Sequence, residues 1–221
     1  MELDIAFIVK HLPLYIEAAK LTLVLAFWGI LFSLIIGIAC NLVFYYKIRI
    51  LTSIAQIYIE LSRNTPLLIQ LFFLYYGLPQ IGLKLNPYVC AVIGLAFLGG
   101  SYMAEAFRSG IEAVGKSQIE SGLSIGLTEK QLAHYIIFPQ AVAIALPAIG
   151  ANVIFLLKET SIFSAIALAD LMFVAKDLIG MYYKTDEALL MLVVAYLIIL
   201  LPLGLLFTYW ERRLRYAGFG D

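Results

Sequence analysis

Residues 21–46 form a long run without a charged side chain. A helix that crosses the hydrocarbon core of a bilayer needs about 20 largely apolar residues, so this run is long enough to span a membrane. The whole chain has the same character, with 63% hydrophobic residues, 14% charged residues and a mean hydropathy of +0.95. Soluble domains carry about 25% charged residues, so the composition indicates an integral membrane protein. The formal net charge of zero gives no reason to expect nucleic acid as a partner.

Four further segments have the length and composition of spanning helices. The five predicted spans cover residues 21–46, 52–78, 87–107, 139–157 and 188–210. We therefore predict an all-α integral membrane protein with five transmembrane helices surrounded by membrane lipid. The length suits a single domain over residues 1–221.

Five spans is an odd number, so the two termini are expected on opposite sides of the membrane. Basic residues after the first span, between the third and fourth, and after the fifth are Lys47, Arg49, Arg108, Lys116, Lys130 and the tail 211–215. Cytoplasmic loops carry an excess of Lys and Arg, which predicts a cytoplasmic C-terminus and an N-terminus outside. The lysines at positions 10, 20, 84, 176 and 184 oppose this orientation.

Two segments are neither spans nor simple loops. Apolar residues at helical spacing within residues 5–20 are Ile5, Ile8, Leu12, Ile16 and Ala19. This pattern predicts an amphipathic N-terminal helix that lies along the membrane surface. Residues 159–184 mix a short apolar run with scattered charges, so we expect this segment to fold back over the outer face without spanning.

The stretch between the third and fourth spans, at about residues 112–139, is polar and contains several glycines. Ser117 and Glu120 have the spacing of a capping box, which predicts a short helix beginning at Gln118. Gly126 is expected to end this helix, because glycine adopts the left-handed conformation at little cost.

A second capping box is formed by Thr128 and Gln131, which predicts a second short helix. Pro139 is expected to break or kink the chain where the fourth span begins. We therefore predict two short helices joined at Gly126 and lying at the cytoplasmic surface. On these residues alone, a structured loop without a partner is the favoured interpretation.

The polar loop resembles the EAA loop of ABC importer permeases. That pattern is Glu-Ala-Ala, three residues, Gly, nine residues, Ile, one residue and Leu-Pro. The matching positions are Glu120, Ser121, Gly122, Gly126, Ile136, Phe138 and Pro139. Ser121 and Gly122 replace the two alanines, and Phe138 replaces the leucine. In this family the loop contains the coupling helix that docks on a cytoplasmic ATPase, so the resemblance implies Glu120, Ser121, Gly122, Gly126 and Pro139 as ATPase-coupling residues.

Three further segments are similar to those of the polar amino acid permeases, the histidine/glutamine permease-like subfamily. They are ELSRNTPLLIQLFFLYYGLP at 60–79, AEAFRSGIEAV at 104–114 and LLKETSIFSAIALADL at 156–171. The resemblance implies the type I ABC importer permease fold and ATP-driven import of a polar amino acid across the bacterial inner membrane. It also implies an ATPase, an extracytoplasmic solute-binding protein and a second permease, identical or homologous. The chain lacks a GxxxxGK[ST] motif, so ATP hydrolysis is expected from the separate subunit and not from this chain.

Ionisable groups within or near spans are functional candidates. Arg108 ends the third span, and an arginine can bind a carboxylate through two hydrogen bonds; the alternative is a basic anchor at the cytoplasmic edge. Glu159 could bind an α-ammonium beside the hydroxyls of Thr160 and Ser161; the alternative is a cap at the helix end. The resemblance places the amino acid between the spans and implies Arg108, Glu159, Thr160 and Ser161 as substrate-binding residues, unless a sibling permease holds the site.

Other charged residues have simpler interpretations. Glu105 precedes Arg108 by three residues, so we expect the two to pair across one helical turn. Glu60 and Arg63 have the same spacing and the same expected pairing. Asp170 is the weakest candidate and is expected at the surface.

Two other classes of function are compatible with a membrane chain. A passive channel or uniporter differs from an importer in equilibrating its solute without ATP. An intramembrane enzyme is disfavoured, since the spans contain no HExxH or GxSxG motif. Cys40 and Cys90 lie in apolar runs and are expected to pack as small hydrophobes. Without a CxxC or a His/Cys cluster we expect no metal site, and we expect no cofactor.

Overall fold

A computed structural model describes residues 3–218, except for the side chains of 214–218. The end of the predicted basic tail, residues 214–215, therefore lies outside the described side chains. The described chain is helical and has no strand, which confirms the predicted all-α class. Its α-helices are α1 (Ile5–Tyr45), α2 (Arg49–Arg63), α3 (Leu67–Phe72), α4 (Pro87–Glu112), α5 (Lys116–Ser124), α6 (Glu129–Leu132), α7 (Phe138–Glu159), α8 (Leu171–Tyr182) and α9 (Thr185–Gly218). Two π turns, η1 (Phe73–Gly77) and η3 (Ala133–Ile137), and two 3₁₀ turns, η2 (Leu78–Ile81) and η4 (Thr160–Ile166), complete the order.

Among the described residues, four helical stretches are long and apolar enough to cross a membrane. They are Ile5–Tyr45, Pro87–Glu112, Glu129–Ile166 and Thr185–Arg213, and they contain the first, third, fourth and fifth predicted spans. The second predicted span is not one continuous helix, because α2 ends at Arg63 and α3 begins at Leu67. Pro66 explains this break, since a proline disfavours the helical conformation in the residue before it.

The first span and the predicted surface helix are one helix, so the prediction of a separate amphipathic helix is wrong. No glycine or proline separates Lys20 from the apolar run that follows, and Glu17 pairs with Lys20 at 2.6 Å across one helical turn. Pro13 lies inside α1 without ending it. At 1.5 Å per residue, α1 is about 60 Å long, roughly twice the thickness of a bilayer's hydrocarbon core.

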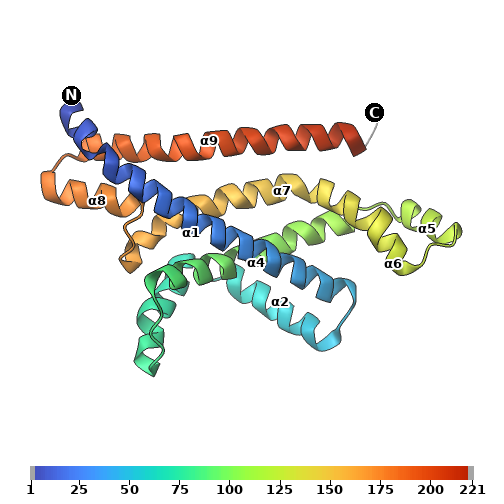
Figure 1. The fold of residues 1–221 in the computed structure, drawn as a ribbon. Helices are drawn as coiled ribbons and strands as arrows, with labels where there is room; N and C mark the ends of the chain where they lie inside the picture. The colour runs from blue at the N-terminus through green and yellow to red at the C-terminus, as the bar shows by residue number, and fades with distance from the viewer. Residues whose placement is uncertain (1–2, 219–221) are drawn as a thin grey trace.

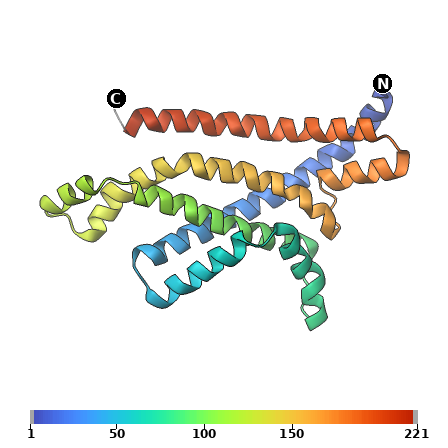
Figure 2. The same ribbon diagram turned by 180° about the vertical axis from the view of Figure 1, so that it is seen from behind.

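Helix α4 lies at the centre of the bundle, between α1 and α7, and α9 covers the other side of α7 (Figures 1 and 2). Segments α5 and α6 extend from one end of the molecule, where α9 also ends. The N-terminus and α8 lie at the opposite end, so the two termini are far apart (Figure 1). Of the segment predicted to fold back without spanning, residues 159–166 continue the stretch Glu129–Ile166, whereas α8 lies outside the candidate spans and folds back against α1 and α9.

Small residues allow α1 and α4 to approach closely. A side-chain carbon at Gly37 would lie 2.6 Å from Cβ of Met103 and 2.9 Å from the backbone nitrogen of Ala104. Two buried polar side chains also join these helices: Ser33 Oγ donates to the Leu95 carbonyl at 3.3 Å, and Asn41 Nδ2 donates to the Ala104 carbonyl at 2.7 Å. Small interfacial residues and interhelical hydrogen bonds are typical of membrane helix packing.

Both cysteines are buried, as predicted. Cys90 is fully buried in the main hydrophobic core, which gathers residues of α1, α3, α4, α7 and η4, and Cys40 belongs to a smaller cluster with Ala55, Ile59 and Ala104. The chain therefore uses its cysteines as small apolar side chains.

Candidate functional site

The polar loop between α4 and α7 contains the predicted pair of short helices, α5 and α6. The first does not begin as predicted: Gly115 is its N-cap, and Ser117 makes no capping bond. Gly115 has an extended backbone (φ −61°, ψ 131°), so the helix already includes Lys116 and places Ser117 one residue inside it. The capping box predicted for Ser117 and Glu120 is therefore wrong.

Helix α5 ends next to Gly126, as predicted. This residue has a φ of +84°, in the left-handed region. The amide of Leu127 donates to the Gly122 carbonyl at 3.1 Å, and the amide of Gly126 donates to the Leu123 carbonyl at 3.0 Å. This pair of bonds is the Schellman motif, which satisfies two carbonyls that a helix end leaves free.

The second capping box is confirmed. The Gln131 amide donates to Thr128 Oγ1 at 3.4 Å, and the Thr128 amide donates to Gln131 Oε1 at 2.9 Å. Pro139 does not break the chain, because the turn η3 joins α6 to α7 and the helical path continues through it. Proline removes one backbone hydrogen bond from a helix, and a one-residue bulge accommodates that loss.

A small apolar cluster holds the loop against the bundle. Its buried members are Val114, Leu132, Ile137 and Ala141, and Tyr45 at the end of α1 packs against them. Gly122 is buried, since a carbon added there would lie 2.6 Å from Cδ1 of Leu132. The outer side of α5 is open: Glu120 and Ser121 are exposed, and Leu123 and Ile125 expose 50% and 78% of their surface. The inner side of the loop is thus packed against the bundle, and its outer side is exposed.

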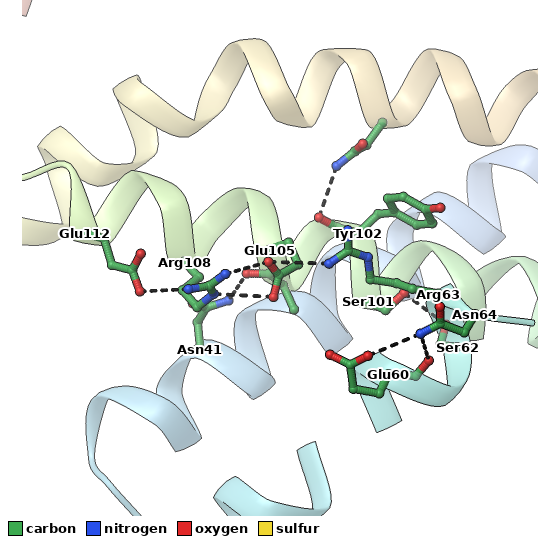
Figure 3. A network of polar contacts seen from close by, with 12 residues as sticks. Asn41, Glu60, Ser62, Arg63, Asn64, Ser101, Tyr102, Glu105, Arg108 and Glu112 are labelled. Carbon is green, nitrogen blue, oxygen red and sulfur yellow. Dashed lines mark hydrogen bonds and ion pairs between the residues drawn. The ribbon is translucent and has the colours of Figure 1, made fainter. Parts of the chain in front are cut away.

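A row of alternating charges runs along α4 toward this loop. It consists of Arg63, Glu105, Arg108 and Glu112, which we call the charged row (Figure 3). Arg108 Nη2 and Nε donate to the Glu105 carboxylate at 2.7 and 3.3 Å, and Nη1 donates to Glu112 at 2.9 Å. Arg63 Nη1 lies 3.5 Å from Oε2 of Glu105. The predicted pairing of Glu105 with Arg108 is confirmed.

The predicted pairing of Glu60 with Arg63 is wrong. Glu60 instead accepts from the side-chain amide of Asn64 at 3.2 Å, and Arg63 turns toward α4, where its guanidinium lies 5.6 Å from the centre of the Tyr102 ring. Arg63 is the last residue of α2. Because the helix ends there, its side chain can turn away from Glu60 on α2 and contact Glu105 and Tyr102 on α4.

Three members of the charged row, Glu105, Arg108 and Glu112, border a cleft of about 760 Å³ between the end of α1, α2 and α4, and Arg63 does not line it. The charged residues that line this cleft are Lys47, Arg49, Glu60, Glu105, Arg108 and Glu112. Three cations and three carboxylates line the cleft, so their formal charges balance.

The residues predicted to bind substrate are not brought together. Helices α4 and α7 run antiparallel, with Gly110 against Ala145 and Gly99 against Leu156. Arg108 is therefore level with the first half of α7, whereas Glu159 is its last residue. At 1.5 Å per residue, Arg108 and Glu159 are about 20 Å apart along the helix axis. The α-carboxylate and α-ammonium of one amino acid share a carbon atom and cannot reach both.

The three residues at the end of α7 differ in exposure. Thr160 is completely buried, and its Oγ1 donates to the Leu157 carbonyl at 2.7 Å. Glu159 and Ser161 are half-buried. Ser161 and Lys158 border a second cleft, beside Tyr196 of α9, whose hydroxyl is buried without a hydrogen bond to any described residue.

Asp170 was expected at the surface, but it is completely buried. It is the N-cap of α8, where Oδ1 accepts from the Phe173 amide at 2.8 Å, while Oδ2 has no partner among the described residues. Burial raises its pKa to about 7. Its position before Leu171 matches an ordinary N-cap signal, but its burial depends on contacts with distant parts of the chain. Within residues 3–218, His, Cys, Asp and Glu form no group of three or more that could hold a metal ion.

Comparison with known proteins gives consistent results. Residues 14–216 match the family described as "Binding-protein-dependent transport system inner membrane component". The chain is 35% identical over 199 residues to the probable amino-acid ABC transporter permease protein PatM of Vibrio harveyi, covering 89% of each chain. It is 32% identical over 217 residues to the glutamine transport system permease protein GlnP of Escherichia coli K12, covering 97% of this chain and 99% of that protein.

Solved structures have the same fold. An amino acid ABC transporter crystallised with histidines superposes with a TM-score of 0.90 at 35% identity, covering 96% of this chain and all of that chain. The MetNI methionine ABC transporter superposes with a TM-score of 0.71 over 95% of this chain and 99% of that one. Its identity is only 17%, so this second likeness concerns the fold alone.

Proposed function

Because the chain belongs to the family of binding-protein-dependent transport system inner membrane components and is an amino-acid ABC transporter permease subunit, we propose that it carries a polar amino acid inward and couples to a separate ATPase through α5. It is a multi-pass inner-membrane protein and not an enzyme. The family implies an ATPase and a substrate-binding protein as partners. A second permease, identical or homologous, completes the proposed importer.

The loop α5–α6 is the observation that supports coupling most directly. It is fixed to α1, α4 and α7 by its apolar cluster, and its outer side exposes Glu120, Leu123 and Ile125. An ATPase could bind the exposed side of α5, and its movement would then be transmitted through the packed side to α1, α4 and α7. If the ATPase docks here, the loop and the end of α9 are cytoplasmic and the N-terminus is outside.

The solute path is proposed to pass the charged row and the end of α7 at different depths. Arg108 lies near the loop, whereas Glu159 and Ser161 lie about 20 Å further along the bundle. These residues, with Thr160 behind them, therefore contact the solute in succession in this proposal, and not together.

The experiment is to purify the chain gently from its native membranes, identify the co-purifying proteins and reconstitute the complex in vesicles. We expect an ATPase to co-purify and the amino acid to accumulate against its gradient only with ATP. Glu120→Lys should remove the ATPase from the complex while the chain still inserts in the membrane. Retention of the ATPase and full uptake by this variant would rule out coupling through α5, and ATP-independent equilibration by the purified wild type would favour a passive channel.

A further inference from the structure

We propose that Arg63 and Glu105 together bind the α-carboxylate and α-ammonium of the transported amino acid. This proposal rests on the proposed function and assigns its central contact to the break between α2 and α3. Arg63 provides the hydrogen-bond donors for the carboxylate, and Glu105 accepts from the ammonium. In this bound state Arg108 positions Glu105, and it contacts the solute only at the later point of the path, nearer the loop.

The two arginines differ in the donors they have available. A guanidinium carries five N–H groups. Arg108 uses three of its donors in hydrogen bonds to Glu105 and Glu112. Arg63 makes no hydrogen bond to any residue of the described chain, and its only carboxylate contact is the 3.5 Å approach to Glu105. Arg63 therefore has the free planar edge that binding a carboxylate through two hydrogen bonds requires.

The helix break holds Arg63 in place. Backbone carbonyls at the break have no amide partner within a helix and instead accept from nearby side chains. Thr65 Oγ1 donates to the Leu61 carbonyl at 2.8 Å, and Gln70 Nε2 donates to the Thr65 carbonyl at 2.9 Å. Ser62 is completely buried and its hydroxyl bonds to that of Ser101 on α4 at 2.9 Å. The residue next to Arg63 is thus fixed to α4, while the Arg63 side chain itself is 43% exposed. Discontinuous helices are characteristic of substrate sites in transporters.

The depth also fits a site within the membrane. Arg63 lies over Tyr102, in the interior of α4, whereas Arg108 is in its last two turns. Tyr102 in turn stacks with Phe155 of α7, with ring centres 5.2 Å apart, and its carbonyl accepts from Asn152 Nδ2 at 3.1 Å. Arg63 therefore packs on a ring of α4 that is itself held by α7.

The charge pattern accommodates a zwitterion without leaving a charge unpaired. The charged row alternates in sign as Arg63, Glu105, Arg108 and Glu112 (Figure 3). An amino acid inserted between the first two places its carboxylate on Arg63 and its ammonium on Glu105, so the alternation continues. Glu105 stays bound to Arg108 at 2.7 Å, which keeps its carboxylate in position.

The test measures binding to the purified permease–ATPase complex without the solute-binding protein, which would impose its own selectivity. The probes are radiolabelled L-glutamine and L-histidine, competed by unlabelled L-glutamine, its α-amide or N-acetyl-L-glutamine. We expect the wild type to bind the amide and the N-acetyl derivative about tenfold or more weakly than L-glutamine, because each lacks one charge-assisted contact. Arg63→Gln should bring the amide and the free acid to nearly equal affinity.

The variants separate the possible outcomes. Glu105→Gln should remove the discrimination against N-acetyl-L-glutamine, and Arg108→Gln should keep the preference for the free acid over the amide. An unchanged acid-to-amide ratio in Arg63→Gln would overturn the proposal, as would loss of that ratio only in Arg108→Gln. Thermal unfolding of each complex identifies variants that fail to fold, and Arg63→Lys, which keeps the charge, replaces Arg63→Gln in that case. If neither amino acid binds the wild type and no polar amino acid is taken up with ATP, the proposed function itself fails.

Discussion

Two segments join the last three spanning helices, and they are built in opposite ways. The loop α5–α6 between α4 and α7 is shaped by backbone motifs within a few residues of each other, an apolar cluster fixes its inner side to the bundle, and its outer side is exposed. The corner formed by η4 and α8, between α7 and α9, is held by residues distant in sequence. There the Leu171 amide donates to Thr22 Oγ1 at 3.4 Å, and Ala175 and Leu178 of α8 pack in one buried cluster with residues of α1 and α9.

The difference indicates what each segment is for. A segment stabilised by its own turns keeps its shape when its surface is covered or uncovered, which suits a docking element. A segment packed against α1 and α9 contributes to the stability of the bundle itself. Substitutions in the corner should therefore lower global stability, whereas those in the loop should act locally and on coupling.

Removing the buried cap of α8 should have the largest effect on stability. Asp170→Ala removes the acceptor for the Phe173 amide and is expected to lower the free energy of unfolding by about 1–2 kcal/mol. The measurement is thermal or denaturant unfolding of the purified chain in detergent. Asp170→Asn retains an acceptor and should lose much less; equal losses in both variants would show that the cap does not stabilise the corner.

The same residue should make stability depend on pH. Its folded-state pKa of about 7 exceeds the ordinary value of 3.8, so the folded chain holds this proton more tightly than the unfolded chain. The resulting stability is fully present below about pH 4 and is lost as the pH rises through about 7. We expect the unfolding temperature of the wild type to fall over this interval relative to that of Asp170→Asn. Parallel pH profiles for the two proteins would contradict the raised pKa.

In the loop, Gly126→Ala should cost about 1 kcal/mol, because a residue with a side chain is disfavoured at a φ of +84°. No atom lies within 4 Å of the added carbon, so the effect comes from the backbone alone. Gly126→Asn is the matched control, since asparagine tolerates this conformation better. Hydrogen exchange should show faster opening in residues 116–132 of the alanine variant with little change in α8. Destabilisation spread over the whole bundle would mean that the loop is not a local unit.

The smallest effect on stability is expected at the exposed side of α5. Ile125→Ser should change the free energy of unfolding by less than about 0.5 kcal/mol, because 78% of Ile125 is exposed. If the ATPase covers this residue, its affinity should fall by up to about tenfold. Titration of the ATPase against the reconstituted permease measures this affinity, and the comparison is Gln118→Ser, at an exposed residue within α5, whereas Ile125 is the C-cap of that helix. Equal affinity in wild type and Ile125→Ser would place Ile125 outside the contact.

The sequence by itself was sufficient for the features that depend on neighbouring residues. Hydropathy located four of the spans, and the turn chemistry of Gly126 and Thr128 located the ends of the short helices. These signals are strong because a bilayer requires about 20 apolar residues in sequence and because capping bonds join residues a few positions apart. The family was predicted from the resemblance of the polar loop and three further segments to known permeases, and this prediction is confirmed.

Only the tertiary structure decided which charges meet. The spacing of Glu60 and Arg63 suggested a pair, but the break at Pro66 turns Arg63 toward Glu105, on another helix. Helical spacing says which residues share a face, and it does not say which neighbour that face contacts. For the same reason Asp170 was expected at the surface although α8 is packed into the bundle. The separation of Arg108 from Glu159 depends on the antiparallel register of α4 and α7, which is determined by the packing of small residues such as Gly99 and Gly110.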